Sequence, residues 1–207
     1  GHFSFLRLLP VKNHANLRNK ILSYTQVDEE LLMGELLHYD QIVLSKGDTL
    51  LTPGKVENRF YYLEKGCVCY YKEEDGEIKV LEFYTEDVFF TDLLSYVNEK
   101  TSNCYLKALE DTIVFAVNKK VAETSFDNSH QLERFGRLSM QEAFMKLFTR
   151  VERMTLRSNE ERYLRLLEKR PELFQRVPNY LIASYLGMTP VGLSKLRKRL
   201  SATISAG

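Results

Sequence analysis

A cluster of cations near the end of the chain has the composition of a polyanion-binding surface. Lys195, Lys198 and Arg199 lie within five residues of one another, and Arg197 lies between them. Positive side chains at this density bind the phosphates of nucleic acids, and these contacts supply affinity and salt dependence. Contacts to base edges in the major groove supply specificity. A solvated basic helix face is the alternative explanation for the same charges.

The net charge of +1 conceals an uneven distribution. Residues 1–149 contain 17 Lys and Arg against 23 Asp and Glu, a balance of −6. Residues 150–207 contain 12 against 5, a balance of +7. This asymmetry predicts a basic module that meets a polyanion, joined to an acidic module that does not.

Two short helices are predicted to position the cations. Residues 180–186 have a helical pattern that ends at Gly187, a suitable C-terminal cap. Thr189 is a plausible N-cap, and Pro190 follows at the first helical position, where its missing N–H costs nothing. The second helix, residues 191–200, is predicted to expose a basic face to solvent and to bury Leu193, Leu196 and Leu200 on the opposite face. Two short helices around a glycine turn predict a helix-turn-helix, with a generic helical hairpin as the alternative.

A longer helix of nearly thirty residues is predicted from about residue 128. Its apolar residues recur at spacings of 4, 3, 4 and 3, which is typical of a seam between paired helices. These residues are Met140, Phe144, Leu147, Val151 and Met154. A second stripe on a neighbouring face, formed by Leu138, Met145 and Phe148, is expected to pack on the helix's own domain. The sequence thus predicts a homodimer through this helix; a single long core helix is the alternative.

Residues 41–117 have the texture of an all-β sandwich or roll. Short β-branched and aromatic runs are separated by turn signals, of which Asp75-Gly76 is the strongest hairpin signal. A helical interruption is expected at residues 92–96. The first forty residues are predicted to be helical, with Asp28 as an N-cap, and Ser158 with Glu161 is predicted to form a capping box.

Metal, disulfide and membrane chemistry are not expected. Cys67, Cys69 and Cys104 are an odd number for a disulfide framework, and we expect them to be small buried hydrophobic residues in a reducing compartment. The four histidines show no ligand spacing. No stretch is long and apolar enough for a membrane span, and no signal pattern opens the chain, so a cytoplasmic location is expected. No catalytic motif is present, so no enzyme is expected.

The order of these parts resembles the bacterial Crp/Fnr transcription regulators over nearly the whole chain. The most specific stretch is residues 176–200, which looks like the DNA-reading unit of that family. The turn glycines also fall where the family's cyclic-nucleotide-binding fold places its turns: Gly47, Gly54, Gly66 and Gly76.

The resemblance implies an α+β fold in three parts. Residues 1–126 would form an antiparallel β-roll sensor with flanking helices, residues 127–157 a dimerisation helix, and residues 158–207 a winged-helix-like helix-turn-helix domain. Because only seven residues follow Leu200, a full wing hairpin is not expected. The implied function is a homodimeric transcription regulator that binds near-palindromic DNA and contacts RNA polymerase. A nucleotide-sensing regulatory subunit that acts through protein contacts is the alternative.

The phosphate-binding residues of the family's cyclic AMP binders are replaced here. Those proteins open a short helix with glycine and glutamate and add an arginine-serine pair about ten residues later. This chain has Phe90-Thr91-Asp92 and Ser102-Asn103 at the two places. A buried cyclic phosphate needs helix N-terminal amides and a bidentate cation, which serine cannot supply.

We therefore expect a degenerate effector pocket that does not bind cyclic AMP, with no cofactor and an unknown effector. Its residues would be Thr91, Asp92, Leu93, Leu94, Ser102 and Asn103. The long-helix position that would meet the base falls near Leu147-Phe148, which offers no hydrogen bond. The family's iron–sulfur branch is excluded because residues 1–40 contain no cysteine.

The base-reading positions of the family correspond to Pro190, Val191 and Lys195. Pro190 cannot donate a hydrogen bond, and Val191 offers a methyl contact that suits thymine, so Lys195 is the best candidate to contact a guanine. The other DNA-binding candidates would meet phosphates or allow close approach: Arg176, Asn179, Tyr180, Thr189, Gly192, Ser194, Lys198 and Arg199. Capping or packing roles are the alternative for Thr189, Asn179 and Tyr180.

Overall fold

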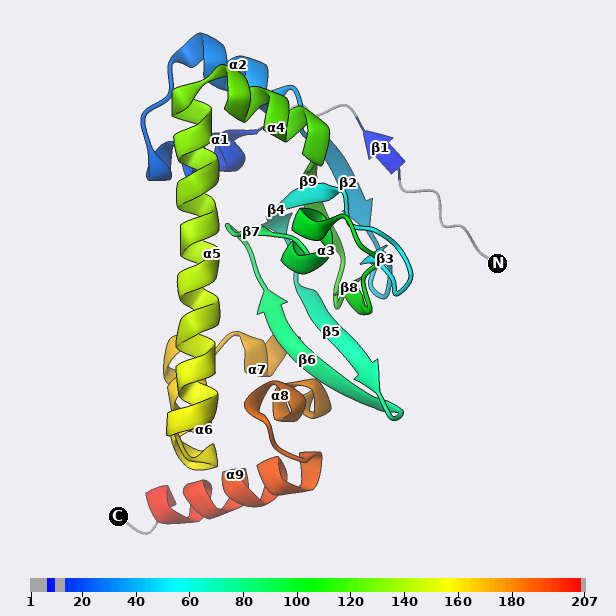
Figure 1. The fold of residues 1–207 in the computed structure, drawn as a ribbon. Helices are drawn as coiled ribbons and strands as arrows, with labels where there is room; N and C mark the ends of the chain where they lie inside the picture. Colours follow the sequence, from blue (N-terminus) through cyan, green and yellow to red (C-terminus); the bar gives the residue numbers. More distant parts are fainter. Residues whose placement is uncertain (1–6, 10–13, 206–207) are drawn as a thin grey trace. The chain divides into compact units, whose positions relative to one another are not determined.

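The computed structural model describes residues 7–9 and 14–205 of the 207-residue chain. The chain packs as two compact units. The first unit contains the residues through Tyr70 together with Phe83–Met145, and the second contains Tyr71–Glu82 together with the residues from Lys146 onward. Figure 1 labels the elements of both units. Within the described ranges, no helix combines the length and the apolar character that a membrane crossing requires.

Two sheets form the centre of the β-region. The five-stranded sheet has the order β1 (Arg7–Leu9), β2 (Asp40–Leu44), β9 (Thr112–Asn118), β4 (Arg59–Lys65) and β7 (Phe89–Phe90). The four-stranded sheet has the order β3 (Thr49–Leu51), β8 (Cys104–Ala108), β5 (Val68–Glu74) and β6 (Glu77–Tyr84). Antiparallel pairs join β1 to β2, β2 to β9, β4 to both β9 and β7, and β3 to β8. The predicted β-roll is confirmed.

Alternation along β4 supplies side chains to two separate cores. Tyr62 points into a cluster with helical residues, whereas its neighbours Tyr61 and Leu63 belong to the cluster with residues of the second sheet. In β9, Phe115 likewise belongs to the cluster with the helical residues, and Val114 belongs to the cluster with the second sheet. Because side chains alternate across a strand, both faces of the five-stranded sheet are buried, which explains why its strands read as nearly continuous apolar runs.

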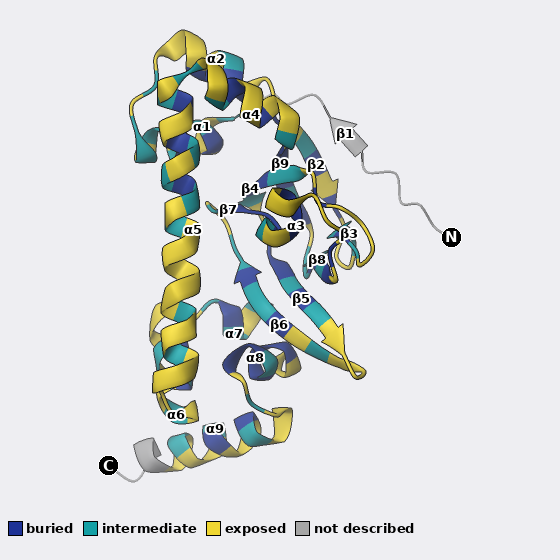
Figure 2. Ribbon diagram, in the orientation of Figure 1, coloured by how far each residue is buried: buried dark blue, intermediate teal, exposed yellow. Residues whose placement is uncertain are grey.

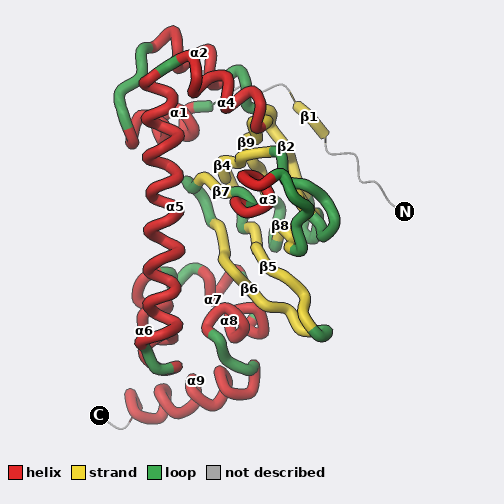
Figure 3. Tube along the Cα trace, viewed as in Figure 1, coloured by secondary structure: helices red, strands yellow, loops and turns green. Residues whose placement is uncertain are grey.

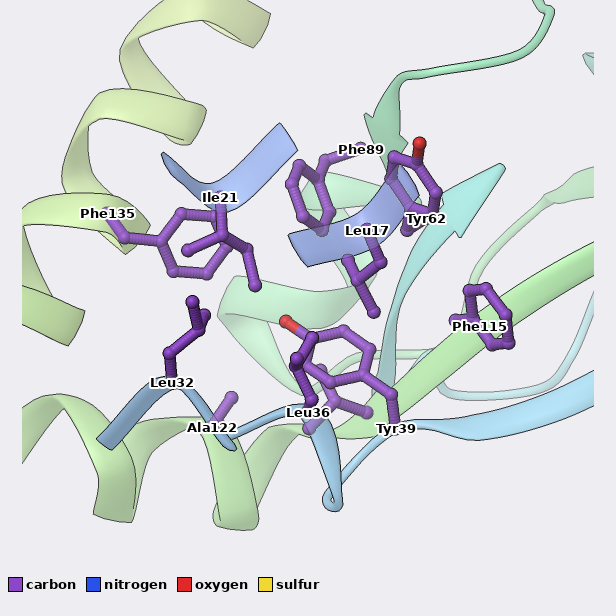
Figure 4. Close-up of a cluster of buried hydrophobic side chains, with 11 residues drawn as sticks. Leu17, Ile21, Leu32, Leu36, Tyr39, Tyr62, Phe89, Phe115, Ala122 and Phe135 are labelled. Carbon is purple, nitrogen blue, oxygen red and sulfur yellow. The ribbon is translucent and has the colours of Figure 1, made fainter. Parts of the chain in front are cut away.

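Helices cover one face of that sheet. They are α1 (Ala15–Tyr24), α2 (Glu29–Leu36), α4 (Lys119–Asn128) and the first half of α5 (His130–Leu156). Figure 4 shows Leu17, Ile21, Leu32 and Phe135 converging on the rings of the sheet. Phe135 is fully buried, and its ring centroid lies 5.2 Å from that of Phe89.

The N-terminal region corrects two expectations. Arg7–Leu9 is a strand where helix was predicted, because these residues pair with β2. Asp28 occupies the N-cap position of α2, but its side chain makes no capping bond and accepts one from Gln131 Nε2 at 3.0 Å. The helix α4 was not foreseen, because it begins directly where β9 ends. The division into helices, strands and loops is shown in Figure 3.

The turn between β5 and β6 confirms the predicted hairpin. Asp75 and Gly76 both have positive φ, 53° and 76°. Two consecutive left-handed residues are the conformation of the tight turns that match the twist of paired strands. The same sequence signal therefore fixes both the position and the register of this hairpin.

The first half of the long helix α5 buries one face, whereas nearly all residues of its second half are exposed (Figure 2). Leu132, Phe135 and Ser139 face the core of the first unit. The predicted own-domain stripe is wrong, because Met145 and Phe148 are each 53% exposed. The last buried residue of this helix is Ser139, more than two turns before the end of the predicted stripe at Phe148.

Among the described residues that follow α5, the second unit contains four helices: α6 (Asn159–Lys169), α7 (Leu173–Arg176), α8 (Asn179–Leu186) and α9 (Pro190–Ser205). The predicted capping box at Ser158 and Glu161 is present at the start of α6. Leu193 and Leu196 are buried as predicted, but Leu200 is only half-buried. The last helix extends to Ser205, five residues beyond the predicted end, because no residue after Leu200 breaks it.

The outer edge of β6 is bonded to the helices of the second unit. The Ser184 hydroxyl of α8 accepts a hydrogen bond from Val80 N at 2.9 Å and donates one to Ile78 O at 2.8 Å. Arg150 of α5 donates from Nη2 to Val80 O at 2.7 Å. Arg170 forms an ion pair with Glu82 at 3.1 Å. The tip of the hairpin is thus part of the same unit as α6–α9.

Candidate nucleic-acid interface and effector pocket

The turn between α8 and α9 has the geometry of a helix-turn-helix. Gly187 has a φ of 72°, and the N–H of Met188 reaches back to Ala183 O at 2.9 Å. The Thr189 hydroxyl accepts from Gly192 N at 3.0 Å, which confirms Thr189 as the N-cap. The positive φ is the reason for glycine at this position. A Cβ at position 187 would also lie 2.7 Å from Met154 Cε, the flexible end of a methionine side chain that would have to shift.

The outward face of α9 carries the candidate base-reading residue. Lys195 and Lys198 are exposed, and neither forms an ion pair with the described residues. Val191 is 64% exposed, and Ser194 and Thr189 also face solvent. Neither lysine has to break an ion pair before it contacts a phosphate or a base edge. Lys195 and Lys198 are therefore the cations of α9 best placed to bind nucleic acid.

The arginines of α9 already have partners inside the protein. Arg197 donates to Asn179 Oδ1 at 2.9 Å, and its guanidinium lies 5.7 Å from the centroid of the Phe174 ring. Arg199 forms an ion pair with Glu160 of α6. The structure therefore places Asn179 and Arg199 in internal contacts. Sequence reasoning missed these contacts because they join residues 18 and 39 positions apart.

The remaining candidates of the interface lie at helix ends. Asn179 and Tyr180 begin α8, and the Tyr180 side chain is 53% exposed. Arg176 ends α7 and is half-buried. Gly192 lies in the first turn of α9, where its N–H is used by the Thr189 cap.

The predicted effector pocket contains a buried polar pair. Asp92 caps the short helix α3 (Leu93–Asn98) by accepting from Ser95 N at 3.3 Å. Ser102 donates to Asp92 Oδ2 at 2.5 Å and accepts from Cys104 N at 2.9 Å. Both side chains are buried, at 3% and 7% exposure. The structure thus brings these two predicted residues together and ties them to each other.

The other predicted pocket residues face different partners. The Thr91 hydroxyl donates to Arg59 O at 2.8 Å, and Asn103 Oδ1 lies 3.2 Å from Cys104 Sγ. Leu93 is half-buried, and Leu94 is 76% exposed.

A second buried carboxylate, which the sequence reasoning missed, lies near Asp92. Glu57 is 3% exposed, and its Oε1 accepts from Arg59 N at 2.9 Å and from the Tyr61 hydroxyl at 3.1 Å. Its Oε2 is buried without a hydrogen-bond partner in the described chain. Burial, with the nearby charge of Asp92, raises the pKa of Glu57 to about 7. No local pattern around Glu57 signals this position.

Aromatic rings fill the interior of the roll. The centroid of the Phe90 ring lies 5.3 Å from that of Tyr61 and 4.7 Å from that of Tyr84, both in stacked geometry. Tyr70 stacks on Tyr84 at 6.5 Å, and burial raises the pKa of Tyr70 well above its ordinary value. Rings and two buried carboxylates are a poor environment for a phosphate, which needs donors and a cation.

The prediction of buried cysteines is confirmed, whereas the expected absence of a metal site stays a prediction. Cys67, Cys69 and Cys104 are all buried, as predicted, and all three are free thiols. Among the described residues, no group of three or more His, Cys, Asp or Glu is arranged to hold a metal ion.

Comparison with known proteins now identifies the β-region. Residues 41–129 match the family model of the cyclic nucleotide-binding domain. No curated protein matches the sequence as a relative.

Solved structures share the fold over most of the chain. CLP of Xanthomonas campestris, described as a c-di-GMP responsive global regulator, is 19% identical, with a TM-score of 0.66 over 85% of this chain and 93% of that one. FixK2 from Bradyrhizobium japonicum is 17% identical, with a TM-score of 0.66 over 80% and 85%. A CooA mutant from Carboxydothermus hydrogenoformans is 17% identical, with a TM-score of 0.52 over 72% and 91%. The chain therefore contains a cyclic nucleotide-binding domain at residues 41–129 and has the fold of the Crp/Fnr-type transcription regulators.

Proposed function

We propose that this protein is a homodimeric, sequence-specific DNA-binding regulator of transcription whose effector pocket does not accept cyclic AMP. The observation that carries the proposal is the outward face of α9, where Lys195 and Lys198 stand free on the second helix of a helix-turn-helix. Such a helix enters the major groove, and a dimer reads two half-sites about one helical turn apart. The bound dimer is then positioned to contact RNA polymerase.

Base reading and phosphate binding fall to different lysines. Lys195 lies one turn from the start of α9, the end of a recognition helix that meets base edges. Lys198 is nearly one turn further along the same helix and is assigned to a phosphate. Arg199 also lies there, but binding DNA requires it to leave Glu160, so its contribution is expected to be smaller.

The experiment is a salt titration of binding to a cognate site selected from random DNA. Lys195→Ala is expected to cost about 1–3 kcal/mol on the cognate site and to relax the preference at one base position. Lys198→Ala should weaken all sequences about equally and reduce the salt slope by about one unit. The control is Lys46→Ala, which removes an exposed lysine from the first unit. If both α9 variants bind like the control, this helix does not enter the groove.

We assign dimer formation to the exposed apolar face of the second half of α5. This face would pack against a second copy of the chain. Phe144, Leu147 and Val151 are 61%, 58% and 54% exposed, and Met154 is 40% exposed. Met140, at the start of the seam, is half-buried. Their spacing of 4, 3, 4 and 3 matches the requirement that two helices interlock along one seam. A lone helix would leave this row of apolar side chains in water.

Light scattering tests the assembly. The wild type should have a mass of about 48 kDa, twice the 24.2 kDa chain. Leu147→Asp with Val151→Asp should give monomers, because like charges would face each other across a dry seam. The control is Thr149→Asp, which adds a charge at an exposed position on the face of the helix opposite the seam, and this variant should stay dimeric. A dimeric double variant would place the interface elsewhere.

The pocket proposal rests on the buried pair Asp92–Ser102 and on the stacked rings beside it. A cyclic phosphate would have to displace the serine hydroxyl and lie against two carboxylates, Asp92 and Glu57. Calorimetry should therefore detect no binding of cyclic AMP at millimolar concentration. Ser102→Arg combined with Asp92→Glu should not restore binding, because the rings of Phe90 and Tyr84 remain in place. A micromolar affinity in the wild type would refute the degenerate pocket.

A further inference from the structure

Three arginines surround a small cavity in the second unit. The cavity has a volume of about 10 Å³. Its cationic lining comes from Arg150 and Arg153 of α5 and from Arg162 of α6. Met154, together with Tyr185 and Leu186 of α8, completes the wall. No carboxylate lines it, and none of the three arginines forms an ion pair with the described residues.

Two of the guanidinium groups hold buried N–H donors that meet no acceptor in the described chain. Arg150 donates from Nη2 to Val80 O and stacks on Tyr185, its Cζ being 4.4 Å from the ring centroid, but its Nη1 is buried without a partner. Arg153 reaches the Tyr185 hydroxyl from Nη2 at 3.5 Å, and its Nε is likewise buried without a partner.

The third arginine completes the positive field without needing a ligand. Arg162 donates to Leu186 O at 2.9 Å, to Arg157 O at 2.6 Å and to Asn159 Oδ1. Each of its three side-chain nitrogens thus donates a hydrogen bond, and these bonds hold its positive charge beside the cavity. The charges of Arg150 and Arg153 add to it, because guanidinium groups remain protonated in proteins.

We propose that this cavity is a binding site for a small inorganic anion of the size of chloride. A buried N–H without an acceptor is costly, and like charges held together in a partly dry space repel each other. One anion relieves both costs, because it accepts from Arg150 Nη1 and Arg153 Nε while neutralising part of the charge. The volume is that of a single water-sized occupant, which excludes nucleotides and organic acids.

The site would join the long helix to the helix-turn-helix. Arg150 and Arg153 belong to α5, whereas Tyr185 and Leu186 belong to α8. An anion held here therefore strengthens the attachment of α8 to α5. This inference is independent of DNA binding, because it concerns residues that are not on the outward face of α9.

The first test measures the melting temperature of the full-length protein as chloride replaces gluconate at constant ionic strength. Gluconate is too large to enter the cavity. The wild type should gain about 2 °C or more, and the gain should saturate as expected for a site that fills. Arg153→Gln should abolish this dependence. Arg134→Gln, which removes an exposed charge from the other half of α5, should retain it.

The second test is a crystal structure in bromide, which does not depend on the stability of any variant. An anomalous peak should lie within hydrogen-bond distance of Arg150 Nη1 and Arg153 Nε. A water molecule there, with no anomalous signal, would overturn the proposal. A bromide peak without saturable stabilisation in solution would mean binding at crystal concentration only and would also overturn it. Equal chloride dependence in Arg153→Gln and the wild type would place the effect elsewhere.

Discussion

Replacing Glu57 by glutamine should change how the stability of the protein depends on pH. Burial raises the pKa of Glu57 from 4.5 to about 7, so the folded state holds this proton more tightly than the unfolded state does. An acid with a raised pKa destabilises the folded state wherever it must ionise. Its cost is absent below pH 4.5, grows as the pH rises from 4.5 to about 7, and is complete above that.

The size of the effect follows from the same pKa difference. A rise of about 2.5 at 1.36 kcal/mol for each pKa unit corresponds to roughly 3 kcal/mol. Glutamine keeps an oxygen that can accept from Arg59 N and the Tyr61 hydroxyl, but it does not ionise. The free energy of unfolding of Glu57→Gln minus that of the wild type should therefore increase by about 3 kcal/mol between pH 4 and pH 8.

Urea denaturation at half-unit pH intervals measures this difference directly, and titrations common to both proteins cancel in it. Glu73→Gln removes the same charge from an exposed position on the hairpin and controls for net charge. A difference for Glu57→Gln that stays constant across the whole pH range would refute the reasoning, because the carboxyl would then titrate alike in the folded and unfolded states.

Three further substitutions test packing and turns. Phe135→Ala should cost about 3–5 kcal/mol of unfolding free energy in urea, because it removes a fully buried ring from the core in Figure 4. Ser184→Ala should speed hydrogen exchange at the Val80 amide, which loses its acceptor, and unchanged protection there would contradict the assigned bond. Gly187→Ala should lower the melting temperature, because alanine disfavours positive φ and its Cβ meets Met154; an unchanged melting temperature would show that the turn relaxes.

Local sequence signals predicted several turns and caps, although the side chain of Asp28 does not cap α2. Gly187, Thr189 and the capping box at Ser158 act through residues only a few positions away, so the pattern carries the whole interaction. The hairpin at Asp75-Gly76 is predictable for the same reason. These local features were enough to indicate the order of β-roll, long helix and helix-turn-helix.

Long-range pairings were not predictable in this way. The apolar pattern of α5 continues past Ser139, but only tertiary packing decides where the helix leaves its own core, so Met145 and Phe148 were misassigned. The bond from Arg197 to Asn179 and the burial of Glu57 likewise depend on segments that the fold brings together. A single sequence therefore indicates which residues are able to form a contact, but the fold determines which of the distant residues become their partners.

The bonds between α8 and β6 also bear on how the protein would aggregate. β6 is the last strand of its sheet, and an unpaired strand edge is a template for strands of other molecules. The Ser184 hydroxyl and the Arg150 guanidinium occupy Val80 N, Val80 O and Ile78 O, the backbone groups that an intruding strand would use. The contacts of α8 and α5 with β6 therefore shield this sheet edge from self-association.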